Sequence, residues 1–143
     1  MISVKYTKVN ENAAEPRRAT AGAAGFDLCA ADAVTLRPGD RVPVPSGIAV
    51  AIPENHVGFV IGRSGLGLKH GITMANGVGV IDSDYRGEIH VLLTNRSDTV
   101  YTVQSGDRIA QLCIVPVIAA EFELTETLPE TGRGANGFGS TGR

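Results

Sequence analysis

The sequence predicts an all-β fold, a jelly-roll-like β-sandwich or barrel with one short helix. The 143 residues include 15 Val and 10 Ile against 9 Leu, and β-branched side chains pack well on a pleated sheet. The 18 Gly and 7 Pro residues divide these apolar segments into short strands. The length fits one domain, with enough chain to bury a core.

Seven segments have the composition of strands, with turn-forming residues between them. These are residues 2–6, 41–44, 48–52, 57–61, 87–94, 100–103 and 108–117. Turns are expected at 38–39, 45–47, 53–55, 95–98 and 105–107. The segments 36–42 and 103–109 resemble each other, which indicates one type of turn used twice rather than a repeat. This spacing of short strands suits a sandwich or jelly roll.

The one expected helix covers residues 64–70. Ser64 can act as its N-cap, and Gly71 can end it in the left-handed conformation. Because Arg63 and Ser64 open this helix, a guanidinium, a hydroxyl and the positive end of the helix dipole meet there. The residues alone leave two interpretations open, an anion-binding site or a capped helix with a surface salt bridge.

Composition excludes several classes of protein. A net charge of -2 and a pI near 5.9 argue against nucleic acid as a partner. No apolar stretch is long enough for a membrane span, and the N-terminal segment has no signal-peptide core, so we expect a cytoplasmic protein. Cys29 and Cys113 are far apart in the sequence and fit buried reduced thiols, and we expect no metal site built by protein side chains alone.

The last thirteen residues, 131–143, form a separate glycine-rich segment. Five of them are Gly and Phe138 is the one large apolar residue, so this segment cannot form a core of its own. We therefore expect a β-domain over residues 1–130 and a flexible arm over 131–143. Matches to the dinucleotide-binding and phosphate-loop patterns fail because no strand and helix surround them and Ser140 replaces the required lysine. Composition alone leaves both a linker and a substrate lid possible.

A second cluster of polar residues lies in the segment IDSDYRGE at 81–88, after a glycine-rich stretch that begins at Asn76. Paired acids in a turn are commonly backbone caps. They can also orient a water molecule beside a flat heterocycle. Spacing does not decide between these alternatives.

Five segments in order resemble the motifs of the homotrimeric dUTP pyrophosphatases, or dUTPases. They are AGFDLCAAD at 24–32, RSGLGLKHG at 63–71, NGVGVIDSDYRGE at 76–88, GDRIAQL at 106–112 and RGANGFGSTG at 133–142. The resemblance implies a trimeric jelly roll that converts dUTP and water into dUMP and pyrophosphate, which lowers dUTP and supplies dUMP for thymidylate synthesis. The alternatives are a dCTP deaminase-like enzyme of the same fold and a non-catalytic nucleotide-binding trimeric switch.

The resemblance also implies roles for residues of the 76–90 region. Asp82 would orient and deprotonate the attacking water. Asn76 and the main chain around Val80 and Ile81 would bind the uracil edge. Tyr85 would lie under the deoxyribose and exclude a ribose hydroxyl, and His90 would add a main-chain contact to the base.

The phosphates would be bound elsewhere in the sequence. Arg63, Ser64 and Gly65 would hold them at the helix start, and Gln111 would bond near the α-phosphate. Mg²⁺ would arrive on the triphosphate, with Asp27 contacting it indirectly through water. The arm of one subunit would close over the site of another, where Phe138 would stack on uracil. The outer phosphates would be bound by the remaining arm residues, Arg133, Gly139, Ser140 and Thr141.

Overall fold

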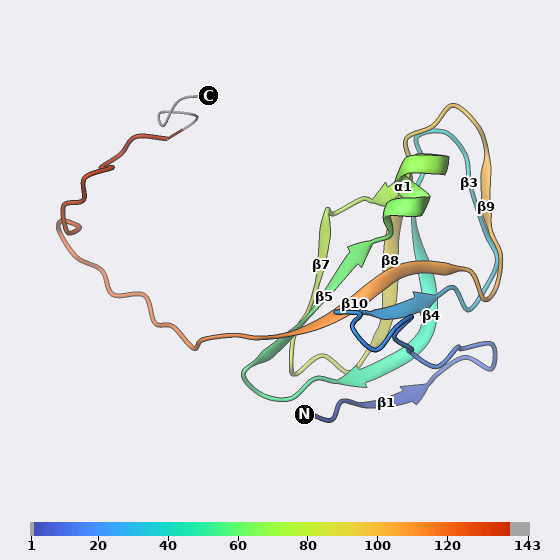
Figure 1. Ribbon diagram of the computed structural model, residues 1–143, viewed down its shortest axis with the longest axis horizontal. Helices are drawn as coiled ribbons and strands as arrows, with labels where there is room; N and C mark the ends of the chain where they lie inside the picture. The colour runs from blue at the N-terminus through green and yellow to red at the C-terminus, as the bar shows by residue number, and fades with distance from the viewer. Residues whose placement is uncertain (1, 138–143) are drawn as a thin grey trace.

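The computed structural model describes residues 2–137, and within them the chain forms ten β-strands and one α-helix (Figure 1). The strands are β1 Lys5–Lys8, β2 Phe26–Cys29, β3 Val34–Leu36, β4 Arg41–Ala51, β5 His56–Gly62, β6 Ile72–Met74, β7 Val78–Ile81, β8 Glu88–Asn95, β9 Tyr101–Val103 and β10 Arg108–Pro116. The helix α1 is Ser64–His70. The prediction of a mostly β protein with one short helix is therefore confirmed.

The strands form two four-stranded sheets and one two-stranded ribbon. One sheet has the order β1-β4-β8-β6, the other β2-β10-β5-β7, and β3 pairs with β9. All of these pairs are antiparallel. Among the described residues, no helix is both long and apolar enough to cross a membrane.

Both four-stranded sheets contribute to one hydrophobic core. In β8 the side chains of Ile89, Val91 and Leu93 are buried, whereas His90 and Leu92 between them are exposed. This alternation is the period of a strand with one face on a core. Leu28 from β2 and Leu112 from β10 enter the same core from the other sheet. The two sheets therefore hold each other in place as rigid supports for the loops between them.

Each predicted strand overlaps an observed one, but the short strands β2, β3, β6 and β7 were missed. The turn predicted at 45–47 was wrong, because β4 continues through it with an irregular register between Pro45 and Ala49. Ser46 donates through Oγ to the carbonyl oxygen of Ile89 at 2.6 Å. The backbone N–H of Gly47 donates to Oε1 of Glu88 at 2.7 Å. These bonds satisfy polar groups at the irregularity, so the strand bends instead of ending.

The turn predicted to occur twice is present in both places. The backbone N–H groups of Arg37 and Gln104 each donate at 2.8 Å to the Oδ2 of the acid three residues later. Each turn has a glycine with positive φ, 84° at Gly39 and 88° at Gly106. A side chain would be strained in that conformation, which accounts for glycine at both positions.

The helix covers the predicted residues, but its start differs from the prediction. Arg63 is the N-cap, with extended backbone and no capping bond from a side chain, so the prediction that Ser64 caps the helix was wrong. Gly71 ends the helix in the left-handed conformation as predicted. Both cysteines are free thiols, although each is half-buried rather than fully buried.

After Pro116 the chain leaves the sheets. Residues 117–137 extend away from the body of the molecule (orange to red in Figure 1). We call the whole segment after Pro116 the arm, which is longer than the arm expected at residues 131–143. Its side chains Ile118, Phe122, Leu124 and Leu128 are almost completely exposed. Several large apolar side chains exposed along one segment are unusual on a monomeric protein and are typical of a surface that binds a partner. The boundary expected at residue 130 stays a prediction.

Candidate active site

The predicted site residues lie in three separate parts of the structure. One group surrounds residues 82–87, which cross from β7 in one sheet to β8 in the other and which we call the β7–β8 loop. A second group lies where β5 leads into α1, and a third belongs to the arm. The first group was expected to contact the base, the sugar and the attacking water, and the second the phosphates. The third was expected to contact both the base and the outer phosphates.

The group at the β7–β8 loop lines a cavity of about 260 Å³. Its lining includes all of the residues of the 76–90 region that were expected to bind the base, the sugar and the water: Asn76, Val80, Ile81, Asp82, Tyr85 and His90. The backbone of β7 is paired with β5 through Gly58 to Ile61. The backbone at Val80 and Ile81, which was expected to bind the base, is therefore fixed by a sheet and not by a loop.

Tyr85 is held against the end of the β7–β8 loop that leads into β8. Its hydroxyl donates to the carbonyl oxygen of Glu88 at 3.0 Å, and its ring covers Gly87 so closely that a Cβ there would lie 2.3 Å from Oη. Glycine is therefore required for this position of the ring. Glu88 also accepts a hydrogen bond from the N–H of Gly47, and its Oε2 lies 3.6 Å from Nε2 of His90. Sequence reasoning assigned Glu88 no role. Its side chain nevertheless links the start of β8 to β4 through the hydrogen bond from Gly47.

Asp82 is exposed at the end of β7. Its carbonyl oxygen accepts a hydrogen bond from the N–H of Tyr85 at 3.2 Å, which closes the turn. Among the described residues, its carboxylate takes part in no hydrogen bond or ion pair. A carboxylate in this state can accept a hydrogen bond from a water molecule in the cavity.

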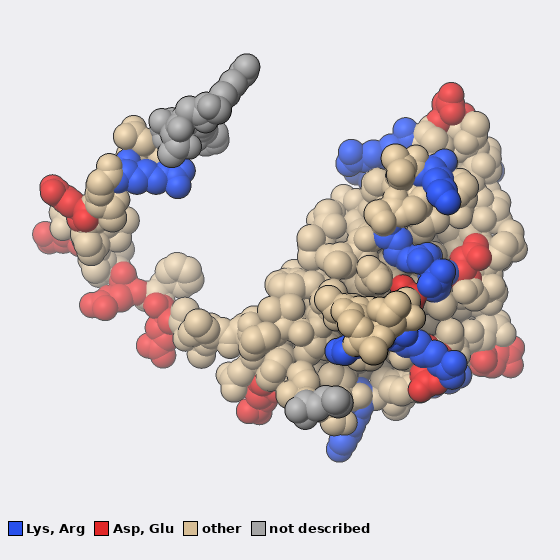
Figure 2. Space-filling view, in the orientation of Figure 1, with Lys and Arg blue, Asp and Glu red and all other residues tan. Residues whose placement is uncertain are grey.

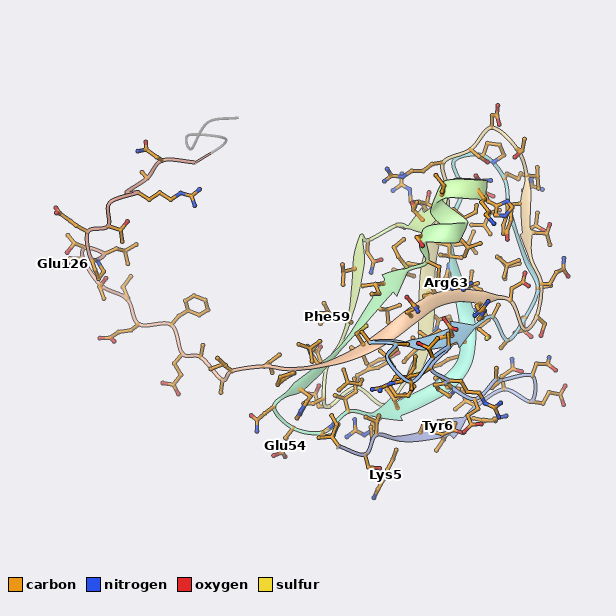
Figure 3. All side chains as sticks on the ribbon, viewed as in Figure 1. Lys5, Tyr6, Glu54, Phe59, Arg63 and Glu126 are labelled. Carbon is orange, nitrogen blue, oxygen red and sulfur yellow. The ribbon has the colours of Figure 1, made fainter. Side chains whose placement is uncertain are left out.

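The second group forms a cluster around Asp27, which we call the phosphate corner: Asp27, Arg63, Arg108 and Gln111. The Asp27 carboxylate lies 3.1 Å from Nη1 of Arg108 and 3.7 Å from Nε of Arg63. Gln111 donates to it at 3.4 Å, and Arg63 donates to the carbonyl oxygen of Arg108 at 3.1 Å. Figure 3 shows Arg63 beside β10, and Figure 2 shows several Lys and Arg side chains on this face of the body.

Sequence reasoning missed Arg108, although the motif that contains it was identified. Arg108 and Gln111 are three residues apart, so a regular strand would direct them to opposite faces. The register of β10 against β2 shifts between Arg108 and Ala110, and both Ile109 and Ala110 are buried. This bulge brings Arg108 and Gln111 to the same side. No local sequence pattern reveals this bulge, because β10 also has adjacent apolar residues at 112–115 and does not alternate along its length.

Ser64 and Gly65 are exposed at the start of α1, close to Arg63. The space around Gly65 is open, with no atom within 4 Å of an added Cβ. Bound phosphate oxygens therefore have free access to this turn. Within the described part of the chain, no group of three or more His, Cys, Asp or Glu side chains is arranged to hold a metal ion.

The phosphate corner also contains a thiol. Cys29 lies beside Asp27 and Arg108 in the same hollow. Burial raises the pKa of the Cys29 thiol above its ordinary value, and the nearby charge of Asp27 raises it further. The neutral thiol is therefore the favoured form at neutral pH.

The cavity at the β7–β8 loop and the phosphate corner are far apart in one chain. Ile81, next to Asp82, pairs with Gly58, whereas Arg63 follows Gly62 at the other end of β5. Asp82 thus lies beside the strand about six residues away from Arg63, which is about 20 Å at the rise of a β-strand. Side chains cannot close that distance, so one chain does not bring these two groups to one phosphorus atom.

The third group belongs to the arm. Arg133 is described, and its Nε donates to the carbonyl oxygen of Asn136 at 2.9 Å. Phe138, Gly139, Ser140 and Thr141 lie outside the described residues. Their expected contacts with uracil and phosphate stay predictions.

Comparisons with known proteins agree on one family. The dUTPase family model matches residues 11–142. A deoxyuridine 5'-triphosphate nucleotidohydrolase of Anaeromyxobacter sp. (strain Fw109-5) is 51% identical and covers 99% of each chain. The protein of the same name from Desulfitobacterium hafniense (strain DSM 10664 / DCB-2) is 49% identical, over 99% of this chain and 95% of its own.

Solved structures give the same result. A variant of the Staphylococcus bacteriophage 80alpha dUTPase with dUpNHpp has a TM-score of 0.93 at 27% identity, with full coverage of both chains. A variant of the dUTPase from phage phi11 of S. aureus has a TM-score of 0.82 at 28% identity, over 88% of this chain and 98% of that one. The description of the phi11 structure concerns the coordination of a structural Mg(II) ion.

Proposed function

The chain belongs to the dUTPase family, and we propose that it hydrolyses dUTP to dUMP and pyrophosphate in the presence of Mg²⁺. The observation that carries this proposal is the cavity at the β7–β8 loop. There the Asp82 carboxylate, which is unpaired among the described residues, lies together with the fixed Tyr85 ring. The reaction would lower dUTP and supply dUMP for thymidylate synthesis. A cytoplasmic location stays a prediction from the sequence.

In this reaction Asp82 accepts a proton from the water that attacks the α-phosphorus in line with the leaving pyrophosphate. Asn76 and the β7 backbone at Val80 and Ile81 present hydrogen-bonding groups to the uracil edge, and His90 lies at the edge of the same cavity. Tyr85 packs under the deoxyribose, where a 2′-hydroxyl would meet its ring. Base and sugar are thereby selected largely by exclusion.

The phosphate corner carries the opposite end of the substrate. Arg63, Ser64 and Gly65 bind phosphate oxygens at the start of α1, and Gln111 bonds near the α-phosphate. Two guanidiniums close together offset charge on the departing pyrophosphate. The arm residues, Arg133 together with Phe138, Gly139, Ser140 and Thr141, complete the site by covering the base and the outer phosphates.

Mg²⁺ fits the triphosphate better than it fits the protein. The described residues offer no cluster of carboxylates, and this ion keeps several waters and binds readily to substrate phosphates. When bound, it neutralises charge on the leaving pyrophosphate. The indirect contact expected of Asp27 stays a prediction.

We further propose that the active unit is a homotrimer of jelly-roll subunits with shared sites. The separation of about 20 Å between Asp82 and Arg63 along β5 supports active sites shared between subunits. The β7–β8 loop of one subunit can then meet the phosphate corner of another. A cyclic arrangement repeats such a contact at every interface.

The arm supports the same assembly. Its apolar residues Ile118, Phe122 and Leu124 are separated by even numbers of residues and are fully exposed. That spacing fits a strand with one buried face. An apolar hollow of about 590 Å³ on the body, lined by residues that include Tyr6, Phe26 and Arg18, suits the arm of a second copy. The acidic side chains along the arm in Figure 2 complement Arg18 at this hollow.

The activity is tested by pyrophosphate release from dUTP, UTP, TTP and dCTP with Mg²⁺, using the wild-type protein and Asp82→Asn. We expect rapid release from dUTP alone and a loss of about 10³-fold or more in the variant. Binding of dUTP without release would indicate a nucleotide-binding switch. Ammonia release from dCTP would indicate a deaminase.

Sharing of the sites is tested by mixing Asp82→Asn with Arg63→Ala after unfolding and refolding the two together. Each variant alone should be inactive. In random mixed trimers a site is intact when its Asp82 comes from an Arg63→Ala chain and its Arg63 comes from an Asp82→Asn chain. The chance is one half for each, so about a quarter of wild-type activity should return. No recovery would show that each site lies within one chain.

A further inference from the structure

We propose that Asp27 is a positioning residue that assembles the phosphate corner before substrate binds, and that it acts through Arg63, Arg108 and Gln111 instead of through the metal. This inference rests on the proposed function. It gives a role to a buried carboxylate and assigns Arg108 to phosphate binding.

Both oxygens of the Asp27 carboxylate are already engaged by nitrogen donors. Oδ2 accepts from Nη1 of Arg108 at 3.1 Å. Oδ1 accepts from Nε2 of Gln111 at 3.4 Å and lies 3.7 Å from Nε of Arg63. The side chain of Asp27 is only 9% exposed. Its hydrogen-bonding capacity is thus directed to three protein groups and not to solvent.

These surroundings do not fit a cation. Magnesium and its water shell need oxygen lone pairs, whereas Asp27 faces two guanidiniums and an amide N–H. The two arginines would repel a divalent cation placed beside this carboxylate. The set of donors is instead the kind that holds an ionised carboxylate in place.

The register of the strands explains how the carboxylate reaches all three partners. Asp27 on β2 pairs with Gln111 on β10, and Gln111 pairs on its other side with Ile61 on β5, two residues before Arg63. The bulge next to Arg108 brings that side chain to the same side. One acid on the β2 edge therefore contacts groups from two other chain segments, β10 and the end of β5.

The electrostatics give Asp27 a purpose. Two guanidiniums held near each other repel, and each is free to turn toward water if nothing restrains it. The single negative charge of Asp27 offsets one of the two positive charges and leaves the corner with a net charge of about +1 for the substrate. Ordering these long side chains in advance lowers the entropy cost of binding phosphate.

The test is binding of dUDP, dUMP and deoxyuridine to wild-type protein and Asp27→Asn, measured by calorimetry with EDTA and again with Mg²⁺. We expect Asp27→Asn to weaken dUDP binding by about tenfold to a hundredfold in EDTA, the loss typical of hydrogen bonds to charged groups. Deoxyuridine should bind within about twofold of wild type. The loss for dUMP should be intermediate.

Other outcomes would overturn the proposal. If Asp27 acts through the metal, dUDP binding in EDTA will match wild type and the loss will occur only with Mg²⁺. If Asp27 is merely structural, deoxyuridine will be weakened as much as dUDP. A second variant, Arg108→Gln, should reproduce the phosphate-specific loss, and unchanged dUDP binding in it would contradict the role assigned to Arg108.

The matched control is Asp40→Asn, which removes an acid that accepts a backbone hydrogen bond in a turn outside the corner. It should leave the affinity for all three ligands unchanged. Failure of the proposed function is distinguishable, because a wild-type protein that binds dUDP in EDTA without hydrolysing dUTP would refute the reaction and leave the positioning role open to the same comparison.

Discussion

Replacing Gly87 with Ala should impair sugar selection without unfolding the protein. A Cβ at this position would lie 2.3 Å from Oη and 2.5 Å from Cζ of Tyr85. Ordinary contacts between heavy atoms need about 3.5 Å, so the ring must move by about 1 Å or rotate away. The backbone of Gly87 does not have positive φ, so alanine itself causes no strain there.

The expected changes differ for stability and for selectivity. Displacement of Tyr85 breaks its hydrogen bond to Glu88, which costs about 0.5–1.5 kcal/mol. The smaller conformational freedom of alanine in the unfolded chain returns about 0.4–1 kcal/mol. The free energy of unfolding should therefore change by less than about 1 kcal/mol. If the Tyr85 ring excludes a 2′-hydroxyl as proposed, its displacement should lower the preference for dUTP over UTP about tenfold or more, which is about 1.4 kcal/mol of discrimination.

The measurement is the ratio of kcat/KM for dUTP to kcat/KM for UTP, together with the urea midpoint. Gly22→Ala is the control, because no atom lies within 4 Å of its added Cβ and it is outside the site. Tyr85→Ala should give the same loss of selectivity as Gly87→Ala. An unchanged ratio in Gly87→Ala would refute the argument that the ring position depends on glycine.

Two further predictions concern buried polar groups. Asn95 is 1% exposed, and its side-chain amide donates to the carbonyl oxygen of Leu36 while Oδ1 accepts from the N–H of Ser97. Asn95→Ala should lower the free energy of unfolding by about 2–4 kcal/mol because it leaves buried partners unpaired, and a urea midpoint equal to wild type would contradict this. In a Cys113→Ser background, Cys29 should react with iodoacetamide at pH 8 more slowly than a free thiol, since burial raises its pKa. Because the folded state favours the protonated thiol, the contribution of Cys29 to stability should be complete below its unfolded pKa. It should be lost as the pH rises through the higher pKa of the folded state. Reaction with iodoacetamide at pH 8 as fast as that of a free thiol would disprove the raised pKa.

The longer strands could be predicted because their composition and their turns agree. β8 alternates buried and exposed residues from Ile89 to Leu93, and the turns at Gly39 and Gly106 have the composition that their conformation requires. The strands β6 and β7 have three and four residues, too few to show a period. The continuation of β4 past Gly47 depends on Glu88, a residue 41 positions away, and no local pattern contains that information.

The site was less accessible from the sequence than the fold. The resemblance to known motifs identified residues that line the cavity and the phosphate corner, but it said nothing about which of them touch. Arg108 was overlooked because strand alternation separates it from Gln111, and the bulge that reverses this is visible only in the pairing with β2. The side chain of Ser64 caps nothing, so its hydroxyl is available for a ligand.

The sheet that contains β5 constrains where catalysis can occur. Asp82 and Arg63 are fixed near opposite ends of this strand by antiparallel pairing, so a local rearrangement of loops cannot join them without breaking the sheet. In the proposed reaction the substrate must contact both Asp82, which would activate the water, and the arginines that would hold its phosphates. A second copy of the chain can meet both needs without distorting either part. The proposed sharing of sites also favours a preassembled phosphate corner in every copy, because the β7–β8 loop of another subunit would then meet arginines that are already in position.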